Sequence, residues 1–459
     1  MNSPLSIVIM AAGRGTRMKS ERPKVLHPLA GRSLLDHVRN AVAPLAADRV
    51  LVIVGHKAER VEASVEDSGA RCIVQAPQLG TGHAVQQAVP QLPDAGTTLI
   101  LNGDVPLIAT DTARALVDAC GGRALALLTV LLDDPTGYGR VVRGGDSGDA
   151  VKAIVEHKDA TEAQRAIREG YTGMMAAPTA WLKRAVMAID NRNAQQEYYL
   201  TDLVAMAVRD GVPVVATQAH DETEVLGVNS PMELARLERR FQRREAERLM
   251  QAGVRLADPD RLDVRGTLDC GADVSIDVGC VFEGRVTLGD GVTIGAHCVI
   301  RNAKIEAGAV IQPFTLMDEA VIGPGAIVGP FSRLRPGAVL GADVHIGNFV
   351  EVKNSTLGKG AKANHLAYLG DATVGERVNY GAGSITANYD GANKHRTTIG
   401  NDVHIGSNSV LVAPVAIGDG ATVGGGSTIA QDVPAGKLAV TRAKQVVVEG
   451  WTRPKKKAK

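Results

Sequence analysis

The chain has few aromatic residues, almost no net charge and no long apolar run. Aromatic residues make up 3% of the 459 positions, and 51 Lys and Arg against 50 Asp and Glu give a net charge of +1. A nearly neutral chain has no global field to recruit nucleic acid or an anionic membrane surface. No stretch approaches the roughly 18 apolar residues of a membrane-spanning helix. We therefore expect no nucleic-acid partner and no membrane insertion.

The cysteines are also few and follow no pattern typical of a metal site or a disulfide framework. There are five, an odd number, and none forms a C-x-x-C pair. The first residues lack the basic start of a secretory signal. Both observations predict a reducing, cytoplasmic location and argue against a zinc site.

The length and the pattern of apolar residues indicate more than one domain. Residues 6–10, 50–54 and 98–101 are apolar runs, with helix-like segments such as 33–43 and 110–119 among them. Such runs are typical of strands buried on both faces. Their alternation with helices predicts a Rossmann-like α/β domain over residues 1–229, with a mostly parallel sheet.

A long helix is predicted over residues 230–252. Ser230 and Glu233 have the spacing of a capping box, with Pro231 in the first helical position. The residues that follow are dense in Arg and Glu. Their narrow apolar stripe consists of Leu234, Leu237, Phe241 and Leu249. A helix of about 20 residues spans about 30 Å, so we expect this segment to link two domains.

The remaining residues, 253–459, are dominated by a step of six. Aliphatic residues recur at every sixth position in two long runs and one earlier run: Ile322, Val328, Leu334, Leu340, Ile346 and Val352; Ile399, Ile405, Leu411, Ile417, Val423 and Ile429; and Leu288, Ile294 and Ile300. A period of six is typical of a parallel β-helix. A glycine-rich disordered segment would not keep an aliphatic residue at every sixth position.

This period leads to further expectations. Three hexapeptides per coil place residues 18 apart on neighbouring coils, about 4.8 Å from each other. Cys280 and Cys298 would then stack, either as two small core residues, which we favour, or as a redox pair. The phase breaks between Val374 and Ile399, where the polar segment 387–391 predicts an extruded functional loop. A solvated basic tail is expected from Lys455, Lys456, Lys457 and Lys459.

A glycine-rich turn after the first strand is a candidate phosphate-binding loop. Gly13 and Gly15 let backbone N–H groups approach a phosphate chain. Arg17 and Lys24 supply cations that would neutralise a triphosphate. The spacing differs from the dinucleotide motif G-x-G-x-x-G, and a structural turn with surface cations remains the alternative.

Two further groups carry candidate chemistry. Asp104 follows the strand at 98–101, and ligands of α/β sheets bind at the carboxyl ends of strands. A carboxylate there suits Mg²⁺ shared with substrate phosphates, although a turn residue is equally compatible.

In the periodic half, His365 lies out of phase near Tyr368, with Arg335 and Lys353 in earlier repeats. Histidine is the usual general base near neutral pH, and a structural histidine remains open.

Seven strings, drawn from both halves and in order, are specific. They are AAGRGTRM at 11–18, NGDVPL at 102–107, VEHKDA at 155–160, RLRPGA at 333–338, IGNFVEVK at 346–353, HLAYLGD at 365–371 and NYDGANKH at 388–395. Through them the chain resembles the bacterial bifunctional N-acetylglucosamine-1-phosphate uridylyltransferase / glucosamine-1-phosphate acetyltransferases, from about residue 6 to Pro454. The resemblance implies a left-handed β-helix, against the usual right-handed crossover. The period alone does not give the handedness.

The resemblance implies synthesis of UDP-N-acetylglucosamine for peptidoglycan and lipid A. In the first domain the sugar 1-phosphate would attack the α-phosphorus of UTP and release pyrophosphate. Arg17 and Lys24 would stabilise charge, and Asp104 and Asn229 would hold Mg²⁺. The nucleotide and the sugar would be bound by Met10, Ala11, Ala12, Gly13, Lys24, Gln75, Gly80, Thr81, Asn102, Gly103, Asp104, Gly139, Glu156, Tyr171 and Asn229.

For the second domain, the resemblance implies that His365 takes a proton from the amine of glucosamine 1-phosphate as it attacks acetyl-CoA. The sugar phosphate would be bound by Arg335, Lys353, Tyr368, Asn379, Asn388 and Tyr389, and acetyl-CoA by Ala382, Ser407, Gly425 and Arg442. Family members are trimers that share this site between subunits. A homotrimer through the β-helix is therefore implied, with the C-terminal segment on another subunit.

Two positions depart from the family pattern. Tyr171 stands where Asn is usual, so either that sugar contact is lost or the phenol hydroxyl replaces it. Gly425 stands where Ala is common, a milder change.

Two rival functions are a nucleotidylyltransferase whose solenoid serves only assembly or regulation, and a non-catalytic exchange-factor subunit. His365 and Lys353 argue against the first, and the intact phosphate-binding turn argues against the second.

Overall fold

The computed structural model describes residues 3–144, 150–193 and 195–456. The chain forms two compact units, Met1–Phe241 and Gln242–Lys459. Lys457 and Lys459 of the basic tail lie outside the described residues. Among the described helices, none combines the length and the apolar character needed to cross a membrane.

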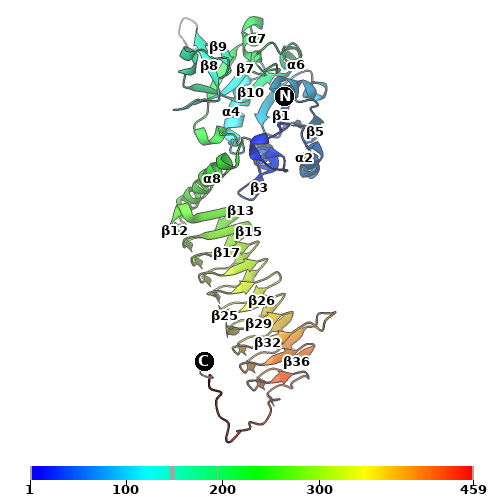
Figure 1. Cartoon of the computed structure of the whole chain (residues 1–459), viewed down its shortest axis with the longest axis vertical. Helices are drawn as coiled ribbons and strands as arrows, with labels where there is room; N and C mark the ends of the chain where they lie inside the picture. Colours follow the sequence, from blue (N-terminus) through cyan, green and yellow to red (C-terminus); the bar gives the residue numbers. More distant parts are fainter. Residues whose placement is uncertain (1–2, 145–149, 194, 457–459) are drawn as a thin grey trace. The chain divides into compact units, whose positions relative to one another are not determined.

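The first unit is built on a nine-stranded mixed sheet (Figure 1), less parallel than the sequence predicts: β1 runs parallel to β4 and β6, whereas β10 runs antiparallel to β6, β7 and β8. The strand order is β11-β7-β10-β6-β1-β4-β5, and β8 and β9 pair beside β10. The bounds are β1 (Leu5–Met10), β4 (Arg49–Val54), β5 (Arg71–Val74), β6 (Thr97–Asn102), β7 (Leu125–Leu131), β8 (Gly139–Gly144), β9 (Ala150–Val155), β10 (Glu169–Pro178) and β11 (Val214–Gln218). The apolar runs at 6–10, 50–54 and 98–101 are thus confirmed as strands.

Helices cover both faces of this sheet because alternate strand residues point to opposite sides. Ile7 and Ile9 of β1 pack in one core cluster and Val8 packs in the other. The first face is covered by α1 (Leu34–Val42), α2 (Ala58–Val65) and α4 (Thr110–Cys120). The second is covered by α3 (Thr81–Ala88), α6 (Thr179–Met187) and α7 (Asp202–Asp210). The predicted doubly covered α/β architecture is confirmed.

The predicted long helix is α8 (Pro231–Gln251). Its capping box is formed: the Glu233 N–H donates to Ser230 Oγ at 3.3 Å, and the Ser230 N–H donates to Glu233 Oε2 at 3.1 Å. Leu237 is buried in the first unit, whereas Leu249 is buried in the core of the second. The two compact units meet within this helix, between Phe241 and Gln242. The domain limits at 229 and 252 remain predictions.

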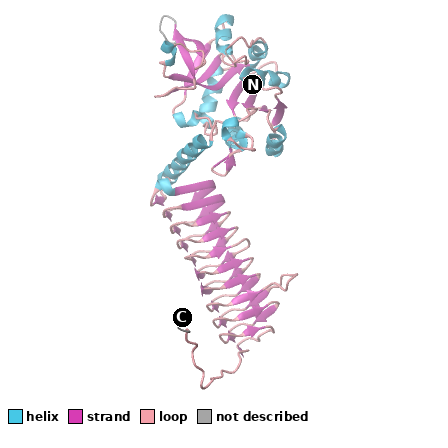
Figure 2. Cartoon of the chain, viewed as in Figure 1, coloured by secondary structure: helices cyan, strands magenta, loops and turns pink. Residues whose placement is uncertain are grey.

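The second unit is a left-handed parallel β-helix with three faces (Figure 2). One face runs from β12 (Arg255–Leu256) to β39 (Leu438–Ala439) and includes β25 (His345–Asn348), β28 (Lys362–His365), β31 (Asn379–Tyr380), β34 (His404–Ile405) and β37 (Thr422–Val423). The second runs from β13 (Leu262–Cys270) to β38 (Thr428–Ile429) and includes β23 (Arg333–Leu334), β26 (Glu351–Lys353), β29 (Tyr368–Gly370) and β32 (Ile385–Ala387). The third runs from β15 (Cys280–Leu288) to β36 (Val415–Ile417) and includes β30 (Ala372–Val374) and β33 (Thr397–Ile399).

The six-residue period is confirmed as the spacing of inward-pointing residues. All fifteen aliphatic residues of the three runs are buried. Leu334 pairs with Val352 on the next coil, 18 residues on. Only glycine fits at some corners: a Cβ at Gly347 would lie 1.9 Å from the Asn364 carbonyl oxygen of the next coil. Coil stacking therefore depends on both the aliphatic step and the glycines beside it.

Both features expected from the period are present. Val374 pairs with Ile399, 25 residues on, so the coil accommodates seven extra residues as a loop between β32 and β33. Cys280 and Cys298 are buried with free thiols. Each thiol lies 3.2 Å from a backbone carbonyl oxygen, of Gly295 and Gln312 respectively. The two cysteines therefore serve as core residues of adjacent coils.

Candidate functional sites

The first site lies where β1 and β6 end side by side. The Gly103 N–H donates to the Met10 carbonyl at 2.9 Å, which fixes the segment 102–104 beside the glycine-rich turn. A pocket at this edge is lined by Met10, Ala11, Ala12, Gly13, Lys24, Gln75, Gly80, Thr81, Asn102 and Asp104, among others. Ten of the predicted nucleotide-binding residues therefore surround one cavity. Gly103 does not line the cavity itself but joins the ends of β6 and β1 through its hydrogen bond to Met10.

The turn itself depends on one glycine. Gly15 has φ 60, and a Cβ there would lie 2.8 Å from the Cβ of Lys24. A side chain at position 15 would be strained by its backbone conformation and would displace Lys24. The glycine therefore brings the lysine against the turn, beside the space for a phosphate chain.

Lys24 lies between the two predicted metal ligands. Its ammonium group contacts Asp104 Oδ2 and lies 3.1 Å from Asn229 Oδ1. Asn229 is positioned by its N–H, which donates to Glu233 at 2.6 Å, and by the preceding N–H of Val228, which donates to the Asp104 carbonyl at 2.9 Å. A carboxylate and an amide oxygen thus converge on one cation. This donor set fits Mg²⁺, which takes oxygen ligands.

A second pocket adjoins the first and shares Met10, Thr81 and Asn102 with it. Gly139, Glu156 and Tyr171 line it, as predicted for the sugar site. Burial raises the pKa of Glu156, and a 3.2 Å hydrogen bond from the Thr201 hydroxyl opposes that rise. A third pocket, lined by Arg17 and Asn229, shares Asn102 and Asp104 with the first. The three cavities are neighbours, so nucleotide, metal and sugar residues adjoin.

Tyr171 lines the second pocket, but its hydroxyl is buried. The residue is 6% exposed, and among the described residues its buried hydroxyl has no hydrogen-bond partner. Burial raises its pKa well above the usual value. The ring forms part of the pocket wall, opposite Gly139 on β8.

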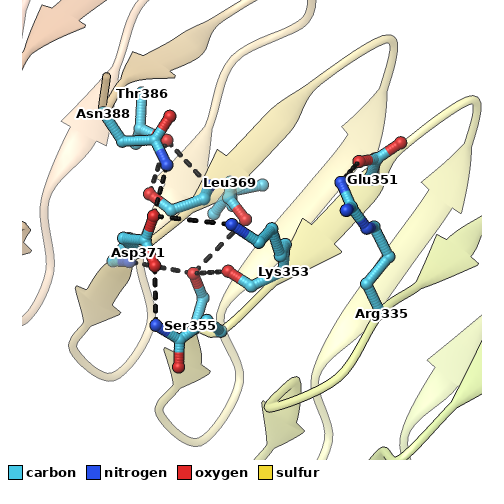
Figure 3. A network of polar contacts seen from close by, with 11 residues as sticks. Arg335, Glu351, Lys353, Ser355, Leu369, Asp371, Thr386 and Asn388 are labelled. Carbon is cyan, nitrogen blue, oxygen red and sulfur yellow. Dashed lines mark hydrogen bonds and ion pairs between the residues drawn. The ribbon is translucent and has the colours of Figure 1, made fainter. Parts of the chain in front are cut away.

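In the β-helix, one column of residues gathers most of the predicted sugar-phosphate ligands (Figure 3). Arg335 and Lys353 follow one another on adjacent coils, and Lys353 pairs with Gly370 on the next. A Cβ at Gly370 would lie 2.2 Å from the Tyr368 hydroxyl, so that hydroxyl lies over the glycine, beside Lys353. Asn388 follows on the next coil. Two cations, a phenol and an amide thereby line one strip.

His365 and Asn379 lie on a different face. His365 Nδ1 lies 3.1 Å from Asn348 Oδ1 of the coil before, and Asn379 Nδ2 lies 3.3 Å from His404 Nδ1 of the coil after. His365 itself is exposed. Within the residues that the structure describes, no hydrogen bond or ion pair joins His365 to Arg335, Lys353 or Tyr368. His365 and Asn379 therefore share the face of β28 and β31, whereas Lys353 and Tyr368 lie on strands of another face and Arg335 directly follows one of them.

The predicted acetyl-CoA residues form a column at one corner. Ala382, Ser407 and Gly425 occupy the same place on three successive coils: the Asn408 N–H donates to the Ala382 carbonyl and the Gly426 N–H to the Ser407 carbonyl. Arg442 passes this corner, since its Cδ lies 3.8 Å from the place of a Cβ on Gly426. A Cβ at Gly425 would lie 3.2 Å from the Ser407 carbonyl oxygen, so an alanine at this position would fit only tightly.

The inserted loop carries Tyr389, which is exposed and donates its hydroxyl to the Gly391 carbonyl at 2.6 Å. Its turn is held by Asp390, whose carboxylate accepts two backbone N–H bonds and lies 2.6 Å from His395 Nε2. These hydrogen bonds hold the pKa of Asp390 below its usual value. The predicted loop is therefore an ordered hairpin turn.

Sequence reasoning did not single out three residues that contact the sites. Lys394, in the inserted loop, lies against Lys353 and lowers the pKa of that lysine. Asp371 joins Lys353 to Asn388. Arg140 is 1% exposed and donates to the carbonyls of Tyr138 and Arg165 and to His157 Nδ1; of these partners, Tyr138 lines the second pocket. Asp371 lies in the string HLAYLGD and Lys394 in the string NYDGANKH, so the sequence contained a signal for both residues.

Comparison with known proteins matches both units. The model of the MobA-like NTP transferase domain matches residues 7–255, that of the GMPPB C-terminal domain matches 264–358, and that of the bacterial transferase hexapeptide (six repeats) matches 396–431. A relative from Methylibium petroleiphilum, called "Bifunctional protein GlmU", is 71% identical over 99% of this chain and 100% of its own length. Proteins of that name from Polaromonas naphthalenivorans and Paracidovorax citrulli are 65% and 63% identical, each over 99% of this chain and 98% and 99% of their own lengths.

Proposed function

We propose, from the fact that this chain belongs to the family of bifunctional GlmU proteins, that it makes UDP-N-acetylglucosamine through two transfers. Glucosamine 1-phosphate first receives an acetyl group from acetyl-CoA in the β-helix. The product then receives a uridylyl group from UTP in the α/β unit, with release of pyrophosphate. The product supplies peptidoglycan and lipid A synthesis, and the enzyme works in the cytoplasm.

For acetyl transfer, His365 acts as the general base. When Asn348 Oδ1 accepts from Nδ1–H, the lone pair of Nε2 is left to take a proton. The amine nitrogen bonds to the acetyl carbon, the carbon–sulfur bond breaks, and coenzyme A leaves as the thiol once protonated. Arg335 and Lys353 bind the phosphate by charge, aided by Tyr368, Asn379, Asn388 and Tyr389. Ala382, Ser407, Gly425 and Arg442 bind acetyl-CoA.

For uridylyl transfer, positioning and charge neutralisation account for most of the catalysis. The turn at 10–13 with Gln75, Gly80 and Thr81 holds the nucleotide, and Arg17 and Lys24 neutralise the triphosphate. Glu156, Gly139 and the ring of Tyr171 hold the sugar, next to Asn102, Gly103 and Asp104. Asp104 and Asn229 would hold Mg²⁺, which would supply positive charge opposite the phosphates. Lys24, which contacts both of these side chains, adds its own charge beside them.

We also propose a homotrimer through the β-helix. Phe314, Phe331 and Phe349 stack at one corner with ring centroids 4.9 and 5.7 Å apart, and each is about half exposed. All three have positive φ, an unusual conformation for a bulky residue. Such a strip of aromatic rings suits a subunit interface. A second copy would also explain why His365 and Lys353 lie on different faces of one chain.

The C-terminal segment supports the same assembly. Val446, Val447, Val448 and Trp451 are each at least 69% exposed. An apolar segment that packs on a second copy would lose that exposure. This arrangement would also bring Arg442, at the start of the segment, to a shared acetyl-CoA groove.

The proposal depends on one observation: each compact unit has its own group of side chains suited to one of the two transfers. The test is to incubate the purified chain with glucosamine 1-phosphate, acetyl-CoA, UTP and Mg²⁺ and to measure product masses. We expect UDP-N-acetylglucosamine with all four components, N-acetylglucosamine 1-phosphate when UTP is omitted, and no acetylated product without acetyl-CoA. Uridylyl transfer to supplied N-acetylglucosamine 1-phosphate without any acetyl transfer would leave a single-activity nucleotidylyltransferase. If the chain catalysed neither transfer, the result would favour a non-catalytic subunit.

A further inference from the structure

Asp371 is a nearly buried carboxylate in the β-helix, at a corner of the coil that precedes the inserted loop. It is 7% exposed and lies at a corner with φ 51, directly after the β29 strand that carries Tyr368. A buried carboxylate is costly unless its oxygens are hydrogen-bonded or paired with a cation. Figure 3 shows that both oxygens of Asp371 are used.

The carboxylate joins three coils through side chains. Asn354 Nδ2, on the coil before, donates to Oδ1 at 2.6 Å, and Asn388 Nδ2, on the coil after, donates to Oδ2. Lys353 Nζ lies 3.9 Å from the same Oδ2. Burial alone would raise the pKa of Asp371, but the two amides and Lys353 outweigh it and hold that pKa below its usual value. The carboxylate therefore stays charged near neutrality.

Asp371 also anchors both ends of the inserted loop. Asn388, which it holds by the side chain, is the residue before Tyr389. At the other end, the Thr397 N–H donates to the Asp371 carbonyl at 3.2 Å. Both ends of the loop that carries Tyr389 and Lys394 are therefore hydrogen-bonded to Asp371.

We infer that Asp371 is a positioning residue for the acetyl acceptor: its carboxylate fixes Asn388 and the base of the inserted loop, and it places a negative charge 3.9 Å from Lys353 Nζ. It does not itself touch the substrate in this arrangement. The inference rests on the proposed acetyl transfer and deepens it, because it concerns how the sugar-phosphate ligands are held.

The charge argument follows from what faces Lys353. Lys394 lies against it and lowers its pKa, as do desolvation and Arg335, whereas Asp371 raises that pKa. Two lysines and an arginine repel one another until a phosphate binds. Removing the carboxylate would leave three cations with no counter-charge from position 371. Lys353 would then lose its proton at a lower pH than in the native protein.

The test compares Asp371→Asn with a paired variant, Asn354→Asp/Asp371→Asn. The single variant removes the charge. Its new amide group at position 371 also faces the two amide groups of Asn354 and Asn388, which both donate. In the paired variant, the new amide at position 371 donates to the carboxylate introduced at position 354 and accepts from Asn388. The hydrogen bonds therefore return while the charge moves to the coil before. The control is Asp402→Asn, an exposed carboxylate on the same solenoid whose ion pair within the described residues is with Arg377, away from this column.

For Asp371→Asn we expect the KM for glucosamine 1-phosphate to rise about tenfold or more, with the KM for acetyl-CoA and the uridylyl transfer rate within about twofold of native. The alkaline rise in that KM should begin at a lower pH. The paired variant should regain the native melting temperature yet keep the raised KM and the shifted pH profile. Asp402→Asn should match the native protein.

Two results would overturn the inference. One is a folded Asp371→Asn protein with native KM and pH profile. The other is full recovery of the KM by the paired variant, which would reduce Asp371 to a structural hydrogen-bonding role. If the native chain itself transfers no acetyl group, the proposed function fails, and that outcome is separate from both.

Discussion

The two units of this chain assemble a site in opposite ways. In the α/β unit, residues as far apart as Lys24 and Asn229, 205 positions, meet in space. They meet because the turn at Gly15 brings Lys24 toward the end of β6, where the Val228 N–H holds the segment before α8 against the Asp104 carbonyl. In the β-helix, residues of one column are 17, 18 or 25 positions apart and stack at fixed places on successive coils. The first arrangement surrounds a pocket within one chain. The second lies along an open face of the β-helix, which is why we propose that a neighbouring copy closes it.

The sharpest way to separate the two sites is His365→Ala. We expect acetyl transfer to fall by about 10²- to 10⁴-fold because the general base is lost. Uridylyl transfer should be unchanged, since His365 lies in the other compact unit. Both are measured on one preparation, by thiol release and by pyrophosphate release. Loss of both activities in a folded protein would contradict independent sites.

The complementary change is Asp104→Ala. It removes one of the two oxygens that converge on Lys24, and we expect Mg²⁺-dependent pyrophosphate release to fall about 10²- to 10³-fold. Acetyl transfer should persist. A titration with Mg²⁺ should show a weaker response than the native enzyme. Native pyrophosphate release would remove Asp104 from the proposed metal site.

The dependence of the second site on a neighbouring copy is tested by Phe331→Ser. Phe331 is the middle ring of the three-ring stack. Loss of a buried aromatic anchor typically costs about 2 kcal/mol or more of association free energy, so we expect dissociation at low micromolar concentration, measured by light scattering. Acetyl transfer should fall with it and uridylyl transfer should not. A monomeric native protein with full acetyl transfer would contradict the shared site.

The smallest expected effect concerns Tyr171→Phe. The buried Tyr171 hydroxyl has no hydrogen-bond partner in the part of the chain that the structure describes, and removing such a group should raise the free energy of unfolding by about 1 kcal/mol. The KM for N-acetylglucosamine 1-phosphate should stay within about twofold, because the ring wall is kept. Denaturant unfolding and initial rates give the two values. A tenfold rise in KM would mean that the hydroxyl turns to the sugar and replaces the amide usual in the family.

Much of the fold followed from the sequence, because its signals were local and repetitive. The buried runs at 6–10, 50–54 and 98–101 became β1, β4 and β6, and the step of six became the inward face of each coil. The capping box at Ser230 formed as expected. The residues predicted to bind the nucleotide lie around one pocket, beside the adjoining ends of β1 and β6.

What the sequence could not provide depends on side-chain directions and on contacts across the insertion. Asp371 reads as a turn residue, and only the folding of Asn388 over it makes it a buried carboxylate. Arg140 reads as a surface cation on a strand, yet it is enclosed by carbonyls of two neighbouring segments. The position of Lys24 between Asp104 and Asn229 is likewise a matter of chain geometry. None of these follows from a spacing.

The seven extra residues between Val374 and Ile399 leave the coils on either side in register. A scaffold with this tolerance can accept extra residues at one corner while the coils on either side keep their structure. New specificities on this architecture can therefore arise by exchanging single loops, while the aliphatic interior continues to supply rigidity.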